Sequence, residues 1–315
     1  MLQLLIGVSR AKFLTLTVVC IALAATASWQ AGATFSPALV ALVLIMALCA
    51  HISANAFNEY FDFHSGLDFL TRRTPFSGGS GVLVARAGMD GAEMDAGAGK
   101  AAHTSADKVA LSVAIASLAV VLVLGLYLTL QLDWRLLLIG VPGVVVIYAY
   151  TQYINRWPLL CLLAPGLGVG LFMTLGAFWV FTGHIGAGAV ILATIVTLLG
   201  SNLLLLNQFP DVEADRQVGR RHYPIVIGRQ RSATLFTVLL CLSYVLLVLA
   251  VAMRWLPPHA LLALLSLALL PQLLRGVYVY AEQSQLLVPY LGLNVVLCHT
   301  VPILLLIGLI WAGRH

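Results

Sequence analysis

The chain of 315 residues is 61% apolar and 9% charged, and its mean hydropathy is +0.99. A soluble globular domain carries about 25% charged residues, so this composition excludes a water-exposed surface over most of the chain and indicates that a lipid bilayer surrounds it. The net charge of +5 comes from dispersed lysines and arginines, which are better read as markers of membrane orientation than as a binding patch. We therefore expect no nucleic-acid partner.

Nine segments are apolar over roughly 20 residues, the length that an α-helix needs to cross a bilayer. They are continuously apolar rather than alternating, which predicts helices and excludes the strands of a membrane barrel. The expected fold class is all-α, a polytopic membrane bundle of nine transmembrane helices that forms a single domain over residues 1–315. The predicted spans are 11–31, 36–57, 108–130, 134–152, 158–181, 187–207, 232–253, 258–276 and 285–311.

The basic residues orient this bundle through the positive-inside rule. With the N-terminus in the cytoplasm, every lysine and arginine except Arg135, Arg254 and Arg314 falls in a cytoplasmic segment. Because nine is an odd number, the C-terminus then lies outside. We expect a multi-pass protein of the cell (inner) membrane.

The first span also has features of a secretory signal peptide. Arg10 and Lys12 precede an apolar run that ends in the small residues Ala25-Thr26-Ala27, which resemble a cleavage site. Cleavage would leave eight spans and put the orientation in doubt. We expect the span to be retained, because nine spans agree with the distribution of the basic residues.

Acidic residues are concentrated in two segments that this topology places in the cytoplasm. All of them except Asp133 and Glu282 lie within residues 59–107 or 211–215. The expected motif loops are therefore about 58–107 and 208–231. Within the first loop, the Gly- and Ala-rich segment 87–106 shows no apolar period and is expected to be a mobile lid over the site.

The first acidic cluster extends the second span beyond the membrane. Asn55, Asn58 and Asp62 follow helical spacing and share one face of the helix. Gly66 is expected to end this helix. Asp68 would lie off the shared face, so a role separate from that of the stripe is expected for it.

The second acidic cluster follows the sixth span. Asn207, Asp211 and Asp215 are each four residues apart and again form one helical stripe. Pro210 should kink the helix just before the acids. The spacing Asn-x-x-x-Asp occurs in both clusters, which favours a shared site over two solvated charged faces.

Two carboxylate stripes at the same membrane depth can hold a hard cation. Mg²⁺ prefers oxygen ligands and usually binds through one or two carboxylates plus substrate phosphates. Carboxylates facing lipid would be costly, so these should face the bundle interior. Nearby arginines can bind phosphate oxygens. We therefore predict a metal–diphosphate site at the cytoplasmic end, with arginines available at positions 72, 73, 216, 220 and 221.

These motifs resemble those of the UbiA-type membrane prenyltransferase superfamily, and the resemblance covers most of the chain. The first cluster is similar to the pattern N-D-x-x-D-x-x-x-G-x-D of its menaquinone branch, here Asn58, Glu59, Asp62, Gly66 and Asp68. The second is similar to D-x-x-x-D-x-x-x-G-[KR], here Asp211, Asp215, Gly219 and Arg220. Segment 73–83 and parts of the fourth and fifth spans are also similar to that branch.

The sequence departs from the branch at three places. Glu59 stands where the family has Asp, His222-Tyr223 replaces Thr-Leu after the second motif, and Val169 stands where Glu is typical. The last two departures weaken the assignment of dihydroxynaphthoate as the acceptor.

The resemblance implies nine spans and Mg²⁺-dependent transfer of a polyprenyl group from an allylic diphosphate to an aromatic quinone precursor similar to 1,4-dihydroxy-2-naphthoate, with release of diphosphate. The isoprenoid tail would lie between apolar helices, which explains the need for a bilayer. The implied metal ligands are Asn58, Glu59, Asp62, Asp211 and Asp215. The candidates to bind the diphosphate are Arg72, Arg73, Arg156, Arg220 and Arg221. The catalytic candidates are Asp68, which would accept the ring proton, and Tyr150.

Several alternatives stay open from the sequence. The acceptor could instead be 4-hydroxybenzoate, a porphyrinoid side chain, glycerol phosphate or a sugar phosphate. Arg156 could equally be a plain anchor at the membrane surface or a residue that contacts substrate. An ion or solute transporter is the rival from another class, because intramembrane acids also mark ion pathways.

Overall fold

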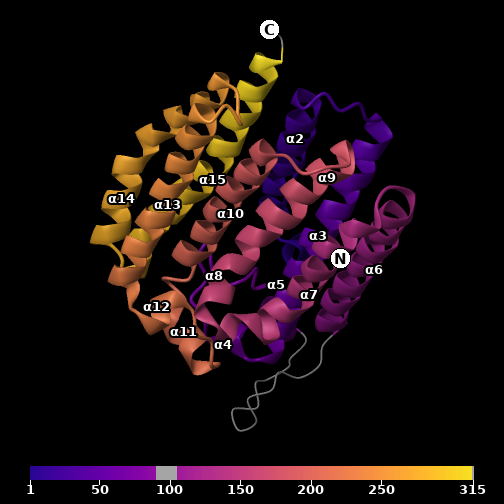
Figure 1. Cartoon of the computed structure of the whole chain (residues 1–315). Helices are drawn as coiled ribbons and strands as arrows, with labels where there is room; N and C mark the ends of the chain where they lie inside the picture. The colour runs from indigo at the N-terminus through magenta and orange to yellow at the C-terminus, as the bar shows by residue number, and fades with distance from the viewer. Residues whose placement is uncertain (90–104, 314–315) are drawn as a thin grey trace.

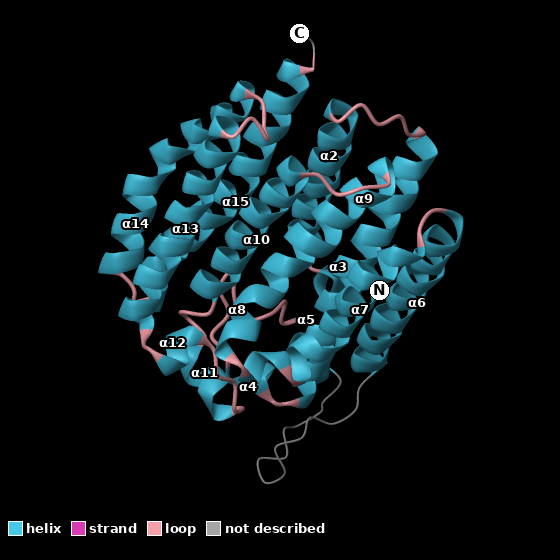
Figure 2. Ribbon diagram, viewed as in Figure 1, coloured by secondary structure: helices cyan, strands magenta, loops and turns pink. Residues whose placement is uncertain are grey.

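The computed structural model describes residues 1–89 and 105–313, which form helices joined by short turns (Figures 1 and 2). Within these ranges, nine helices are long and apolar enough to cross a membrane, which confirms the predicted number. The protein is thus a multi-pass membrane protein. The spans are Ala11–Gln30, Pro37–His64, Ser105–Gln131, Trp134–Gln152, Pro158–Thr182, Ala187–Asn207, Arg229–Ala252, Pro258–Val279 and Ser284–Ala312.

Some spans consist of one helix and others of several consecutive helical elements. The elements are η1 (Ala11–Phe13) and α2 (Leu14–Gln30); α3 (Pro37–His64); α6 (Ser105–Gln131); η2 (Trp134–Leu136) and α7 (Leu137–Gln152); α8 (Pro158–Leu167), the π-helical η4 (Gly168–Leu175) and α9 (Gly176–Thr182); α10 (Ala187–Asn207); α13 (Arg229–Ala252); η5 (Pro258–Leu269) and α14 (Leu270–Val279); and α15 (Ser284–Ala312).

Short helices occupy the ends of the bundle, including parts of both predicted motif loops. They are α1 (Leu2–Ser9), α4 (Leu67–Leu70), α5 (Val82–Met89), η3 (Ile154–Arg156), α11 (Val212–Gln217) and α12 (Tyr223–Val226). In Figure 1, α4, α11 and α12 gather at the end of the bundle opposite the C-terminus. Of the lid predicted over residues 87–106, the part 90–104 lies outside the described residues, and its two edges belong to α5 and α6.

Helix α3 carries the first motif to that end of the bundle. It begins at Pro37, where the Ser36 hydroxyl accepts a hydrogen bond from the Leu39 amide at 3.1 Å. It continues past the predicted span end at residue 57 and stops at His64. Gly66 follows with φ of 78°, a left-handed conformation that glycine adopts at low cost, so the prediction that it ends the helix is confirmed.

The second motif is built differently from the predicted helical stripe. Helix α10 ends at Asn207, Pro210 lies in the following turn, and α11 starts only at Val212. The predicted kink is therefore a complete break. Its physical cause is proline, which lacks the N–H that a continuing helix needs and clashes with the preceding turn.

Helix α10 lies at the centre of the bundle and fixes the position of α8. Gly166 of α8 and Gly170 of η4 face α10 so closely that a Cβ on either would meet Thr197. Small residues permit such close approach between membrane helices. This contact holds the fifth span against α10, whose last residue, Asn207, lies next to the second motif.

Candidate active site

A cavity of about 760 Å³ connects the two motifs with the apolar interior of the bundle. Its polar end is lined by Asp62, Asp68, Asp211, Asp215 and Arg220, among other residues. The remainder runs between α3, α6, α7 and η4 and is mostly apolar. Along α3 the lining extends from Asp62 to Val43, which corresponds to about 28 Å at 1.5 Å per residue, close to the thickness of a bilayer's hydrocarbon core.

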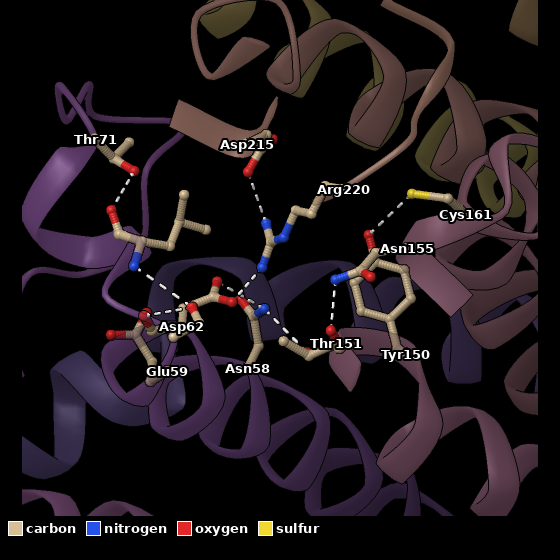
Figure 3. A network of polar contacts seen from close by, with 12 residues as sticks. Asn58, Glu59, Asp62, Thr71, Tyr150, Thr151, Asn155, Cys161, Asp215 and Arg220 are labelled. Carbon is tan, nitrogen blue, oxygen red and sulfur yellow. Dashed lines mark hydrogen bonds and ion pairs between the residues drawn. The ribbon is translucent and has the colours of Figure 1, made fainter. Parts of the chain in front are cut away.

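The first motif presents its side chains from the last turns of α3. Asp62 is 5% exposed and Glu59 is fully buried. The Asn58 side-chain amide donates to Asp62 Oδ2 at 3.0 Å and to Thr151 Oγ1 at 3.1 Å (Figure 3). These bonds fix the orientation of Asn58 and Asp62 toward the cavity.

Arg220 joins the two motifs (Figure 3). Its guanidinium donates to Asp215 Oδ1 at 3.0 Å and also to Asp62 Oδ1. Burial acts to lower the pKa of Arg220, but the two carboxylates outweigh burial, and the pKa is raised. The guanidinium therefore stays charged, and it holds α3 and α11 together at the mouth of the cavity.

Asp215 is satisfied on both oxygens. Besides the bond from Arg220, its Oδ2 lies 2.8 Å from Nε2 of the buried His222. Burial acts to raise the pKa of Asp215, yet Arg220 and His222 together lower it. Asp215 is therefore ionised, as a cation ligand must be.

Two further carboxylates each keep one buried oxygen that has no hydrogen-bond partner within the described residues, Asp68 Oδ2 and Asp211 Oδ1. Burial, together with Asp62 and Glu59, raises the pKa of Asp68 to about 8. Burial and the charge of Asp215 raise the pKa of Asp211 to about 7. Buried oxygens without partners are costly, so this end of the cavity favours a bound cation or an added proton.

The residues present fit a magnesium ion, although the ligands are not preassembled. In residues 1–89 and 105–313, no three His, Cys, Asp or Glu side chains are gathered as ligands of one metal ion. Arg220 lies between Asp62 and Asp215, where it balances their charge. Mg²⁺ commonly takes only one or two carboxylates and completes its shell with water and substrate phosphates, which this set of oxygens allows.

The predicted diphosphate-binding arginines fall into two groups. Arg220 lines the cavity, as described above. The other four are exposed at the same end of the bundle and are not part of the cavity lining: Arg72, Arg73, Arg156 and Arg221. Arg73 donates to the Asp68 carbonyl at 2.5 Å, and the Arg221 amide donates to the Asn155 carbonyl at 2.9 Å.

Tyr150 of α7 also lines the cavity, on the side of α8. Its hydroxyl lies 3.9 Å from Cys161 Sγ, which accepts a hydrogen bond from the Gln208 amide at 3.2 Å. Asn155 donates to the Thr151 carbonyl at 2.5 Å (Figure 3). The structure thus brings Tyr150 into the same cavity as the two acidic motifs, together with polar neighbours that we did not predict.

Arg10 also lines the cavity, although the sequence indicated only a role in membrane orientation for it. Its Nε donates to Glu59 Oε1 at 2.7 Å, and its Nη2 donates to Asn58 Oδ1 at 2.7 Å. A basic residue just before an apolar span is equally typical of a plain membrane anchor. The sequence therefore held no signal that would separate Arg10 from the other cytoplasmic arginines.

Residues 101–310 match the model of the UbiA prenyltransferase family. The chain is 28% identical over 209 residues to the 1,4-dihydroxy-2-naphthoate octaprenyltransferase of Bacillus subtilis strain 168, covering 64% of this chain and 59% of that protein. It is 26% identical over 210 residues to the digeranylgeranylglyceryl phosphate synthase of Natronomonas pharaonis, covering 65% and 63%. The matched part therefore spans less than two thirds of the length of either curated relative.

Solved structures share the whole fold. The apo structure of a UbiA homologue from Aeropyrum pernix K1 has a TM-score of 0.67 and 17% identity, covering 94% of this chain and 98% of that one. A UbiA homologue from Archaeoglobus fulgidus bound to DMAPP and Mg²⁺ has a TM-score of 0.58 and 13% identity, covering 96% and 98%. The predicted all-α membrane bundle is confirmed.

Proposed function

Because the chain belongs to the UbiA prenyltransferase family, we propose that it transfers a polyprenyl group from an allylic diphosphate to an aromatic quinone precursor resembling 1,4-dihydroxy-2-naphthoate, with release of diphosphate. One observation carries this proposal: the same cavity is lined by carboxylates of both motifs and by a long apolar wall. An amphiphilic donor with an anionic head and an isoprenoid tail matches that division. In this proposal residues 1–315 act as one membrane domain.

At the polar end, we assign the oxygen ligands of Mg²⁺ to both motifs: Asn58, Asp62, Asp211 and Asp215. Support comes from the buried Asp211 oxygen without a partner and from the ionised Asp215. The A. fulgidus homologue, which was solved with Mg²⁺ and DMAPP, supports the choice of metal and donor class. When bound, Mg²⁺ supplies Lewis-acid stabilisation of the charge on the departing diphosphate.

The arginines have two proposed roles toward the donor. Arg220 reaches into the cavity, and its planar guanidinium offers paired N–H donors to non-bridging phosphate oxygens. The exposed arginines attract the anionic head to the mouth by their combined charge: Arg72, Arg73, Arg156 and Arg221.

The transfer step breaks the bond between the allylic carbon and the diphosphate oxygen and forms a carbon–carbon bond to the acceptor ring. The ring then loses one proton. Asp68 is the proposed acceptor of that proton, because its buried Oδ2 has no partner among the described residues and it lines the cavity. The ring of Tyr150 is proposed to stabilise the allylic cation by cation–π attraction.

Glycerol phosphate is the second candidate acceptor class. The similarity to the N. pharaonis digeranylgeranylglyceryl phosphate synthase, at nearly the same identity and coverage, favours it. A phosphorylated acceptor would place a second anion beside the exposed arginines at the mouth. An aromatic acceptor would instead occupy the cavity between the motifs and the apolar wall.

For the topology, we propose the cell (inner) membrane with the motif end in the cytoplasm and the C-terminus outside. Arg220 and the four exposed arginines named above all lie at the motif end, which agrees with the positive-inside rule.

The acceptor class is tested by incubating the purified protein with long-chain allylic diphosphates, Mg²⁺ and separate acceptors, with products identified by mass. A prenylated dihydroxynaphthoate-type product supports the proposal, and a prenylated glycerol phosphate selects the second candidate. No prenylated product from any acceptor, with ion flux in liposomes containing the protein, would instead support a transporter.

A further inference from the structure

The segment 71–81, here named the bridging loop, connects α4 to α5 and forms part of the cavity wall. Gly78, Gly79 and Gly81 all have positive φ, so the loop follows a path that only glycine adopts at low cost. The loop packs closely against the acids at this point, because a Cβ built onto Gly79 would lie only 3.1 Å from Asp68 Oδ1.

On one side, the bridging loop is bound by Glu59 of the first motif. Glu59 Oε1 accepts from the Ser80 amide at 2.8 Å, and Oε2 accepts from the Ser80 hydroxyl at 2.6 Å. Oε1 also accepts from Arg10 Nε at 2.7 Å. Both oxygens of this fully buried carboxylate are therefore occupied by Arg10 and Ser80.

On the other side, the bridging loop lies beside the second motif, because Ser77, Gly78 and Asp211 line the same cavity. Ser77 and Gly78 act to lower the pKa of Asp211 against the effect of burial. Lys12 adds a hydrogen bond to the Pro75 carbonyl. The loop thus reaches from Glu59, on α3, to Asp211, at the start of α11.

We propose that Glu59, paired with Arg10, is a positioning residue that anchors the bridging loop between the two motifs, and that it is not a metal ligand. Glu59 stands where the pattern that the first cluster resembles has Asp, and the additional methylene carries its carboxylate to Ser80 and Arg10. The catalytic consequence rests on the proposed prenyl transfer, whereas the anchoring itself does not depend on it.

Anchoring is measured by limited trypsin digestion of the purified, metal-free protein in detergent. Arg72 and Arg73 are exposed trypsin sites within the loop, and mass spectrometry identifies the fragments that end there. Because the Glu59→Gln variant loses charge-assisted bonds, cleavage at these sites is expected to accelerate about ten-fold or more. Glu213→Gln is the matched control, since Glu213 pairs with Arg229 on another part of the site end and should leave cleavage unchanged.

The conservative variant Glu59→Asp separates the two roles. Asp can bind a metal but cannot reach both partners, so positioning predicts fast cleavage, lower turnover and an unchanged Mg²⁺ concentration for half-maximal rate. Ser80→Ala removes the hydroxyl that binds Glu59 and does not alter a proposed metal ligand. It is also expected to speed cleavage and lower turnover.

The proposal is overturned if Glu59→Asp keeps slow cleavage and full turnover, or if Glu59→Gln leaves cleavage unchanged. It is also overturned if Glu59→Asp raises the Mg²⁺ requirement without changing cleavage. If the Glu59 variants do not fold, Ser80→Ala decides, and unchanged cleavage in that variant counts against the proposal. Failure of wild-type protein to transfer any prenyl group would refute the proposed function and leave the digestion result interpretable.

Discussion

Replacing Arg220 with leucine perturbs the contact that holds the two motifs together. The Arg220 side chain is 17% exposed, and the side chains of its partners Asp62 and Asp215, taken without their backbone, are 8% and 4% exposed. Arg220→Leu leaves both carboxylates buried and removes the guanidinium that lies between them. Removing one partner of a buried ion pair costs about 3–5 kcal/mol, so we expect the free energy of unfolding of the metal-free protein to fall by that amount.

The assay is thermal unfolding of the purified protein in detergent, with EDTA or with excess Mg²⁺. The variant should unfold at a lower temperature than wild type in EDTA, and Mg²⁺ should narrow the difference because it neutralises the same carboxylates. Arg221→Leu is the matched control, because Arg221 is exposed and its backbone bond to Asn155 is kept. Equal unfolding temperatures for wild type and Arg220→Leu in EDTA would refute the reasoning.

Two further predictions concern Asp68 and the contact between η4 and α10. Burial, with Asp62 and Glu59, raises the pKa of Asp68 to about 8, and only the ionised form accepts a proton. Wild-type kcat should therefore rise with pH through this value, and Asp68→Asn should be slow at every pH; a wild-type profile retained in the variant would exclude Asp68. Gly170→Ala places a methyl group against Thr197 and should lower the yield of folded protein, whereas Gly168→Ala, with open space around it, should not. Size-exclusion chromatography of both variants measures this difference, and equal yields would contradict the packing argument.

Much of the fold followed from the chain's hydropathy. A bilayer imposes a minimum length on every crossing helix, so nine apolar segments predicted nine spans. The end of α3 near Gly66 could also be predicted, because a glycine that follows a helical stripe commonly marks the end of the helix. The break at Pro210 was harder to foresee, since a proline can kink or terminate a helix depending on what the next residues bind. Here Arg220 and His222 bind Asp215, which fixes the position of α11 after the break.

The pairing within the site could not be read from the sequence. Local spacing did predict acids at the ends of two spans, and four of them line one cavity with Arg220: Asp62, Asp68, Asp211 and Asp215. Arg10, in contrast, reaches Glu59 across 49 positions, and no local pattern encodes such a contact. Nor could the sequence separate Arg220, which lines the cavity, from the four exposed arginines at the same end, because charge alone does not distinguish a cavity residue from one at the rim.

The central claim is that both motifs act together on an allylic diphosphate. Its most direct test is the release of diphosphate from a long-chain donor by purified wild type, Asp62→Asn and Asp211→Asn, with a suitable acceptor and with Mg²⁺ or EDTA. We expect wild type to release diphosphate with Mg²⁺ and not with EDTA. Neither variant should release diphosphate under either condition. Full release by either variant, or release from wild type in EDTA, would contradict the claim.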